Sequence, residues 1–149
     1  MALIYFSGSI SGGRADAGQY RWIVDQLTAQ GHQVLAGMVT DPTIGDQGES
    51  GEVSAIFERD LEWLQKVADA KGVLIAEVSV PSHGVGYEIA TARYRFRIPV
   101  ICLYRPSEGR RCSAMITGDP EIRLIEYSEE GRHSMMLKLL YEVSQTERE

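Results

Sequence analysis

The sequence predicts an α/β domain in which a parallel sheet of five strands is covered by helices on both faces. Short apolar runs alternate along the chain with segments whose apolar residues recur at helical spacing. Turns rich in glycine follow the first and the third of the longer apolar runs. Strands that alternate with helices in this way form doubly wound parallel sheets whose strands are buried.

The first half of the chain begins this alternation. Residues 3–6 are expected to form a buried strand, and residues 16–30 a helix that a glycine ends. A brief strand at 33–35 precedes an acidic, glycine-rich loop at 41–51. Apolar residues at helical spacing then mark a second helix at 53–67.

The second half continues it. An apolar, β-branched run at 72–78 predicts a buried third strand, which a proline ends soon afterwards. Helical spacing returns at 87–95, and a fourth strand is expected at 99–104. After an irregular stretch, the pattern predicts a fifth strand at 122–126 and a closing helix at 134–143.

These elements favour the strand order 2-1-3-4-5, which is the flavodoxin-like arrangement. In that order the first and third strands are neighbours at the switch point, and ligands bind beyond their carboxyl ends. Residues 1–149 are expected to form one domain, with residues 144–149 as a frayed polar tail.

Composition and charge exclude several classes of function. The net charge is −6 and the basic cluster is limited to Arg110 and Arg111, so no nucleic-acid polymer is expected as a partner. No apolar run approaches the roughly 20 residues that span a membrane, and no signal peptide is recognised. Cys102 and Cys112 do not indicate a disulfide scaffold, which favours the cytoplasm or the nucleus. The histidines lack metal-ligand spacing, so no metal site is expected.

Two turns rich in glycine and serine should meet at the switch point. One spans residues 7–14 and the other spans residues 82–86. Glycine lets the backbone approach a ligand, and the start of a helix offers free N–H groups to an anion. Neither turn matches the P-loop or the dinucleotide fingerprint. A phosphate site of another kind is therefore expected, the alternative being two tight turns of an α/β fold.

Glu88 follows the second turn and is the candidate nucleophile. It is expected in the first turn of a helix, where the helix dipole and nearby N–H groups would keep it ionised. An ionised, fixed carboxylate is suited to attack a sugar carbon, provided that a second acid protonates the leaving group. Glu58, Asp60 and Glu62 are candidates, and Asp60 lies beside the apolar stripe of its helix. The Tyr5 hydroxyl needs a partner, either Glu88 or a backbone carbonyl.

Five blocks of sequence identify a family. They cover residues 5–14, 60–65, 76–78, 84–88 and 113–116, and read YFSGSISGGR, DLEWLQ, AEV, GVGYE and SAMI. Together they resemble the 2′-deoxynucleoside 5′-phosphate N-hydrolases of the nucleoside 2-deoxyribosyltransferase superfamily, and they occur in the order found in that family.

The resemblance implies a role for each of these residues. Glu88 would form a deoxyribosyl-5-phosphate enzyme intermediate, Asp60 would protonate the departing base and then help to activate water, and Tyr5 would orient Glu88. Ile23 would line the base pocket. Ser113 would enter the phosphate site from a second subunit, which implies a homodimer. The 5′-phosphate would lie against Gly8, Ser9, Ile10, Ser11, Gly12, Gly13, Arg14, Ser82 and Gly84.

The expected reaction is therefore hydrolysis of the N-glycosidic bond of a 2′-deoxynucleoside 5′-monophosphate, giving a free base and 2-deoxyribose 5-phosphate without a cofactor. A cytidine monophosphate hydrolase and a deoxyribosyltransferase are alternatives with the same fold. A non-catalytic nucleotide-binding module would keep the phosphate turns but would not need Glu88, Asp60 and Tyr5 to converge. A flavodoxin-like redox protein is a further alternative, against which the lack of aromatic residues in both turns speaks.

Overall fold

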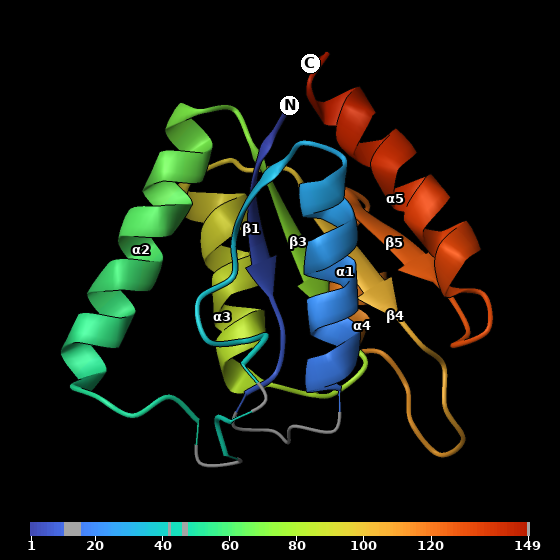
Figure 1. Ribbon diagram of the computed structural model, residues 1–149, viewed down its shortest axis with the longest axis horizontal. Coiled ribbons are helices and arrows are strands. Elements are labelled where there is room, and N and C mark those ends of the chain that lie inside the picture. Colours follow the sequence, from blue (N-terminus) through green and yellow to red (C-terminus); the bar gives the residue numbers. More distant parts are fainter. Residues whose placement is uncertain (11–15, 42, 46–47, 149) are drawn as a thin grey trace.

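The protein is built around a parallel sheet of five strands with helices on both faces (Figure 1). The computed structural model describes residues 1–10, 16–41, 43–45 and 48–148. The strands are β1 (Leu3–Ser7), β2 (Gln33–Leu35), β3 (Val73–Glu77), β4 (Val100–Tyr104) and β5 (Ile122–Glu126). The helices are α1 (Ala17–Ala29), α2 (Val53–Asp69), α3 (His83–Ala90), α4 (Ala114–Thr117) and α5 (Arg132–Thr146), and a π-helical turn, η1 (Thr91–Arg95), follows α3. Within the described ranges, no helix is long and apolar enough to cross a membrane.

The strand order is β2-β1-β3-β4-β5, and every neighbouring pair is parallel. This confirms the order predicted from the sequence. The first and third strands are paired directly, with Tyr5 opposite Leu74 and Ser7 opposite Ala76. Because the strands are parallel, their carboxyl ends meet at one edge of the sheet, which is the lower edge in Figure 1.

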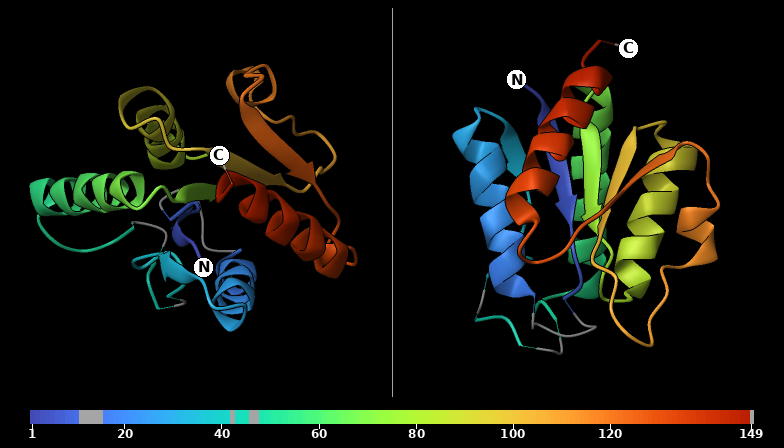
Figure 2. Two further views of the ribbon diagram at one scale, coloured as in Figure 1. Left: turned by 90° about the horizontal axis from the view of Figure 1, so that it is seen from above. Right: turned by 90° about the vertical axis from the view of Figure 1, so that its right-hand side faces the viewer.

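Alternate residues of each strand pack against different helices, because successive side chains point to opposite faces of a sheet. Ile4 and Phe6 face α1 and α5, in a core cluster with Tyr20 and Met135. Tyr5 faces the opposite way, in the cluster that α2 and α3 cover. Figure 2 shows the sheet between these two helical layers.

Gly72 holds β3 close against β1 at the amino end of the sheet. A Cβ atom at this position would lie 2.0 Å from the carbonyl oxygen of Leu3 and 2.9 Å from a methyl group of Val67. Only glycine allows this approach of one backbone to another. The close pairing of β1 and β3 thus requires glycine at the end of the sheet opposite to the two glycine-rich turns.

Two helices differ from the sequence expectation. Helix α3 begins at His83 rather than at residue 87, because the Ser82 hydroxyl caps it by accepting a hydrogen bond from the Val85 amide at 3.3 Å. Helix α5 continues to Thr146, so residues 144–146 do not belong to a frayed tail. Thr146 is buried, and its hydroxyl donates a hydrogen bond to the Val143 carbonyl.

Candidate active site

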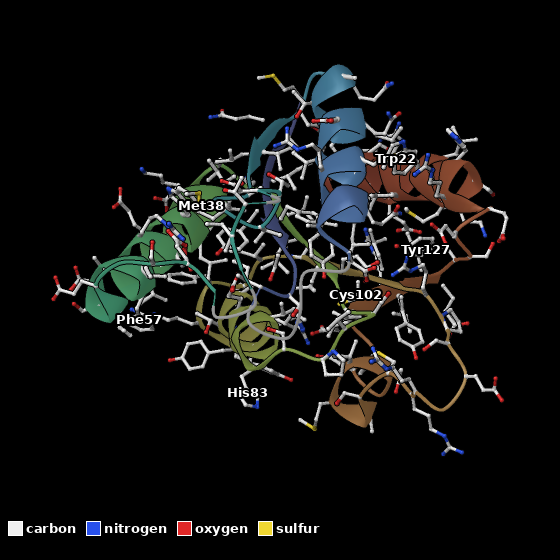
Figure 3. All side chains as sticks on the ribbon, turned by 60° about the horizontal axis from the view of Figure 1, so that its bottom comes forward. Trp22, Met38, Phe57, His83, Cys102 and Tyr127 are labelled. Carbon is white, nitrogen blue, oxygen red and sulfur yellow. The ribbon has the colours of Figure 1, made fainter. Side chains whose placement is uncertain are left out.

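A cavity of about 560 Å³ opens at the carboxyl ends of β1 and β3. Figure 3 brings this end of the molecule forward, and Met38 and His83 mark two sides of the cavity. Residues from β1, α2 and α3 and from the two turns converge here, as the switch-point argument predicted. Seven of the predicted site residues line it: Tyr5, Gly8, Ile10, Asp60, Ser82, Gly84 and Glu88.

Glu88 lies in the second turn of α3, with its carboxylate against the end of β1. Burial raises the pKa of this carboxyl to about 7, although the nearby Tyr5 and Ser7 hydroxyls act in the opposite direction. Asp60 contributes to the increase, because a second negative charge disfavours ionisation. Glu88 was expected in the first turn of its helix, but the helix starts four residues earlier than predicted. Glu88 therefore lies beyond the first turn, where the helix dipole mainly acts, and burial is the largest influence on its pKa.

Tyr5 is buried at the centre of β1, and its hydroxyl hydrogen-bonds to Glu88. Burial, together with the charges of Glu88 and Asp60, raises the pKa of the phenol well above its ordinary value. The hydroxyl therefore keeps its proton and donates a hydrogen bond to the Glu88 carboxylate. The ring of Trp63 meets the Tyr5 ring edge-on, with 6.4 Å between the ring centroids, and fixes the phenol in the core.

Asp60 reaches the same cavity from α2. Burial raises the pKa of its carboxyl, whereas hydrogen bonds from Arg59 lower it. The Arg59 guanidinium bonds to Asp60 Oδ1 through Nε at 3.0 Å and through an Nη atom at 2.8 Å, and also pairs with Glu49. The sequence pointed to Asp60 but not to Arg59 or Glu49. Glu49 belongs to the acidic loop, and no periodic pattern indicates which helix residue such a loop contacts.

In the glycine-rich turn at residues 82–86, Gly84 leaves open space beside the cavity. A Cβ atom on Gly84 would lie 3.8 Å from Ser82 Oγ and 4.0 Å from Glu88 Oε1, in ordinary van der Waals contact with both. The bare Gly84 thus leaves room between the serine hydroxyl and the carboxylate. A ligand that touches both groups can occupy this space.

The structure separates some predicted residues from the cavity. Ile23 is fully buried among Tyr20 and Leu27 on the inner stripe of α1, so it does not line the cavity as expected. Ser9 is buried and is not among the lining residues. Residues 11–14 (Ser11, Gly12, Gly13 and Arg14) lie outside the described residues.

Ser113 caps α4 and lines a neighbouring cavity, also of about 560 Å³, on the other side of Ser82. Its hydroxyl accepts a hydrogen bond from the Met115 amide at 3.2 Å. Met115 itself is 84 % exposed. Within its own chain, Ser113 does not line the cavity that holds Glu88.

A second polar cluster, which sequence reasoning missed, holds the strand ends together. Glu77 is fully buried, and it accepts hydrogen bonds from the Ser79 amide at 2.7 Å and from the Tyr127 hydroxyl. The Arg105 backbone amide donates a hydrogen bond to Ser79 Oγ at 2.8 Å, and its guanidinium forms an ion pair with the Asp16 carboxylate at 2.5 Å. Because Asp16 immediately precedes α1, this cluster ties the start of α1 to the ends of β3, β4 and β5.

No group of three or more His, Cys, Asp or Glu residues that could hold a metal ion occurs in the part of the chain that the structure describes. What the cavity presents instead is a carboxyl with a raised pKa, a second acid and a phenol. Two carboxyl groups that flank one cavity are typical of enzymes that cleave glycosidic bonds. The fold is thus flavodoxin-like, and the cavity is a candidate glycosidase site.

Comparison with known proteins identifies the family within this class. The chain is 47% identical over 117 residues to a Nematostella vectensis protein that is provisionally named 2′-deoxynucleoside 5′-phosphate N-hydrolase 1, covering 77% of this chain and 76% of the relative. It is 42% identical over 138 residues to the 5-hydroxymethyl-dUMP N-hydrolase of Mus musculus, covering 89% of this chain and 76% of the relative. The Homo sapiens protein of the same name is 42% identical over 144 residues, covering 93% of this chain and 79% of the relative. This chain belongs to the 2′-deoxynucleoside 5′-phosphate N-hydrolase family.

Comparison of structures supports the fold alone. A solved structure from Xanthomonas campestris pv. campestris, provisionally described as a hydrolase of the alpha/beta superfamily, superimposes with a TM-score of 0.52 at 13% identity. The match covers 95% of this chain and 99% of the other. No protein-family model matches the chain.

The protonation of Glu88 gives a direct test of this geometry. A titration of the glutamate carboxyl carbons by NMR should show Glu88 with a midpoint at about pH 7. Replacing Tyr5 with Phe removes a hydrogen bond that stabilises the ionised form, so the midpoint should move to higher pH. A wild-type midpoint near that of an ordinary glutamate, or a lower midpoint in Tyr5→Phe, would contradict the arrangement.

Proposed function

We propose that this protein hydrolyses the N-glycosidic bond of 2′-deoxynucleoside 5′-monophosphates, releasing the free base and 2-deoxyribose 5-phosphate. The observation that carries the proposal is the convergence of Glu88, Asp60 and Tyr5 in one cavity. A nucleotide-binding module needs no such convergence. Sequence identity of 42–47% to N-hydrolases of deoxynucleotides supports the choice of substrate.

In the first step, the ionised Glu88 carboxylate attacks C1′ of the sugar as the bond from C1′ to the base nitrogen breaks. Asp60, in its protonated form, gives its proton to the departing base. Charge at C1′ in the transition state is positive, and a nearby carboxylate stabilises it. Tyr5 donates a hydrogen bond to the Glu88 oxygen that does not attack and so holds the other oxygen toward the sugar.

In the second step, water attacks C1′ and the bond to Glu88 breaks, which restores the carboxylate. Asp60, now ionised, accepts a proton from that water and returns to its starting state. The two steps balance without a cofactor or a metal ion. The raised pKa of Asp60 suits it to exchange a proton in both directions.

The 5′-phosphate occupies the space beside Gly8, Ile10, Ser82 and Gly84 in this proposal. Ser82 offers a hydroxyl, and the start of α3 offers backbone N–H groups that attract an anion. Of the other residues of the predicted phosphate turn, Ser9 does not line the cavity, and residues 11–14 lie outside the described residues.

The proposal includes a homodimer. Ser113 is implied in the phosphate site by the resemblance to the family, yet in its own chain it lines the neighbouring cavity. It would therefore reach the phosphate from a second copy of the chain. The exposed Met115 beside it would then be covered by the partner.

Release of free base tests the reaction. We expect the protein to release base from 2′-deoxynucleoside 5′-monophosphates with no acceptor base present, and much more slowly from ribonucleotides and from unphosphorylated nucleosides.

Activity should fall as the pH is lowered below about 7, because Glu88 must be ionised to attack. The Glu88→Gln variant should lose activity by roughly 10⁴-fold or more, because the nucleophile is removed. Chromatography of the products measures each of these. Full turnover by Glu88→Ala, or binding of every nucleotide without base release, would refute the proposal.

Gly84 and Gly86 provide a matched pair of variants for the substrate position. Gly84→Ala places a methyl group between Ser82 and Glu88, where the sugar phosphate should lie, so KM should rise by about tenfold or more. Gly86→Ala meets no atom within 4 Å and should leave KM unchanged. Both variants should fold normally, since alanine is favoured over glycine within a helix. Equal kinetics for the two variants would show that the substrate lies elsewhere.

A further inference from the structure

Arg59 is held between two carboxylates, one from its own helix and one from the loop that follows β2. Both carboxylate oxygens of Glu49 accept hydrogen bonds from the guanidinium: Oε1 lies 2.5 Å from one Nη atom and Oε2 lies 3.0 Å from the other. The Nη atom bonded to Glu49 Oε2 also bonds to Asp60 Oδ1 at 2.8 Å. One nitrogen thus bridges the loop carboxylate and the candidate acid.

The two carboxylates compete for one positive charge. Glu49 lines the cavity, and only 15 % of its side chain is exposed, so its pairing with Arg59 is partly shielded from solvent. Paired fork to fork, a carboxylate and a guanidinium have fixed relative geometry. The Arg59 guanidinium also lies over the Trp63 ring, 4.8 Å from its centroid, which limits its movement.

We propose that Glu49 is a positioning residue for Asp60: it fixes the Arg59 fork and neutralises its charge, so that Asp60 is oriented by Arg59 yet retains the proton for the leaving base. This rests on the proposed function of Asp60. Without Glu49, Arg59 would pair with Asp60 alone, and the ionised form of Asp60 would be favoured. The acid would then have lost its proton at the pH where Glu88 becomes ionised.

Several titratable groups surround Asp60, and their effects on its pKa differ in direction. Arg59 lowers its pKa, whereas burial and the charge of Glu49 raise it. Glu88 on α3 and Tyr5 on β1 face it across the cavity, and His83 at the start of α3 lines the same cavity. Among the described residues, Glu49 is the carboxylate that bonds to Arg59 from outside α2.

Charge-removing variants of the loop test the proposal. In Glu49→Gln, the upper limb of the pH profile of kcat should shift to lower pH, and kcat above neutral pH should fall by about threefold to tenfold with little change in KM. Glu52→Gln is the matched control, since Glu52 bonds to Ser54 and does not line the cavity. It should behave like the wild type.

The double variant Glu49→Gln/Arg59→Gln separates this role from a merely structural one. Removing Arg59 as well removes the excess charge, so the upper limb should return toward higher pH. An unshifted profile in Glu49→Gln would overturn the proposal, as would a fall in kcat that the double variant deepens without moving the limb.

An NMR titration of Asp60 on the Glu88→Gln background gives a second readout that needs no turnover. The Asp60 midpoint should be lower with Glu49→Gln than with Glu52→Gln, and equal midpoints would overturn the proposal. Absence of base release by the wild type would instead refute the proposed function. The two failures are therefore distinguishable.

Discussion

The site depends on the register of β1 against β3. Tyr5 and Ser7 point to the face that α3 covers, while Phe6 between them packs into the opposite core. A slip of one residue would turn both hydroxyls away from Glu88, because side chains alternate along a strand. Gly72 permits the close approach of the two backbones at Leu3, where a Cβ atom would clash. The pairing that brings the Tyr5 hydroxyl to the carboxylate at one end of the sheet thus requires a residue without a side chain at the other end.

Desolvation is the main electrostatic effect in the resulting cavity. It raises the pKa of both Glu88 and Asp60, and each carboxyl has different neighbours that lower its pKa again. The pKa of Glu88 is lowered again by neutral hydroxyls, of which Tyr5 donates a hydrogen bond that orients the carboxylate without adding a charge. The pKa of Asp60 is lowered again by the Arg59 guanidinium, whose positive charge is balanced by Glu49. Two carboxyl groups in one cavity are thereby given different environments, which is the condition for assigning them different roles in one reaction.

The sequence predicted the sheet order because its apolar runs are short, buried and separated by helical periods. It also placed Tyr5 and Glu88 at the switch point, and it offered Asp60 as one of three candidate acids on its helix, from which the resemblance to the family singled it out. It misplaced the start of α3, because two glycines hid a helical turn that Ser82 caps. Ile23 was misassigned because the inner stripe of a helix and a pocket wall have the same apolar composition. Glu49, Arg59 and the Glu77 cluster were missed, because contacts between segments far apart in the chain leave no local pattern.

In the proposed mechanism, a carboxylate oxygen of Glu88 forms a covalent bond to C1′ of the sugar. Rapid quenching of a single turnover, followed by mass spectrometry of the peptide that contains Glu88, tests it most directly. The account predicts a transient adduct with the mass of 2-deoxyribose 5-phosphate on Glu88, formed as base is released and lost as the sugar phosphate appears. Base release at the full rate with no adduct on Glu88 at any time would contradict it.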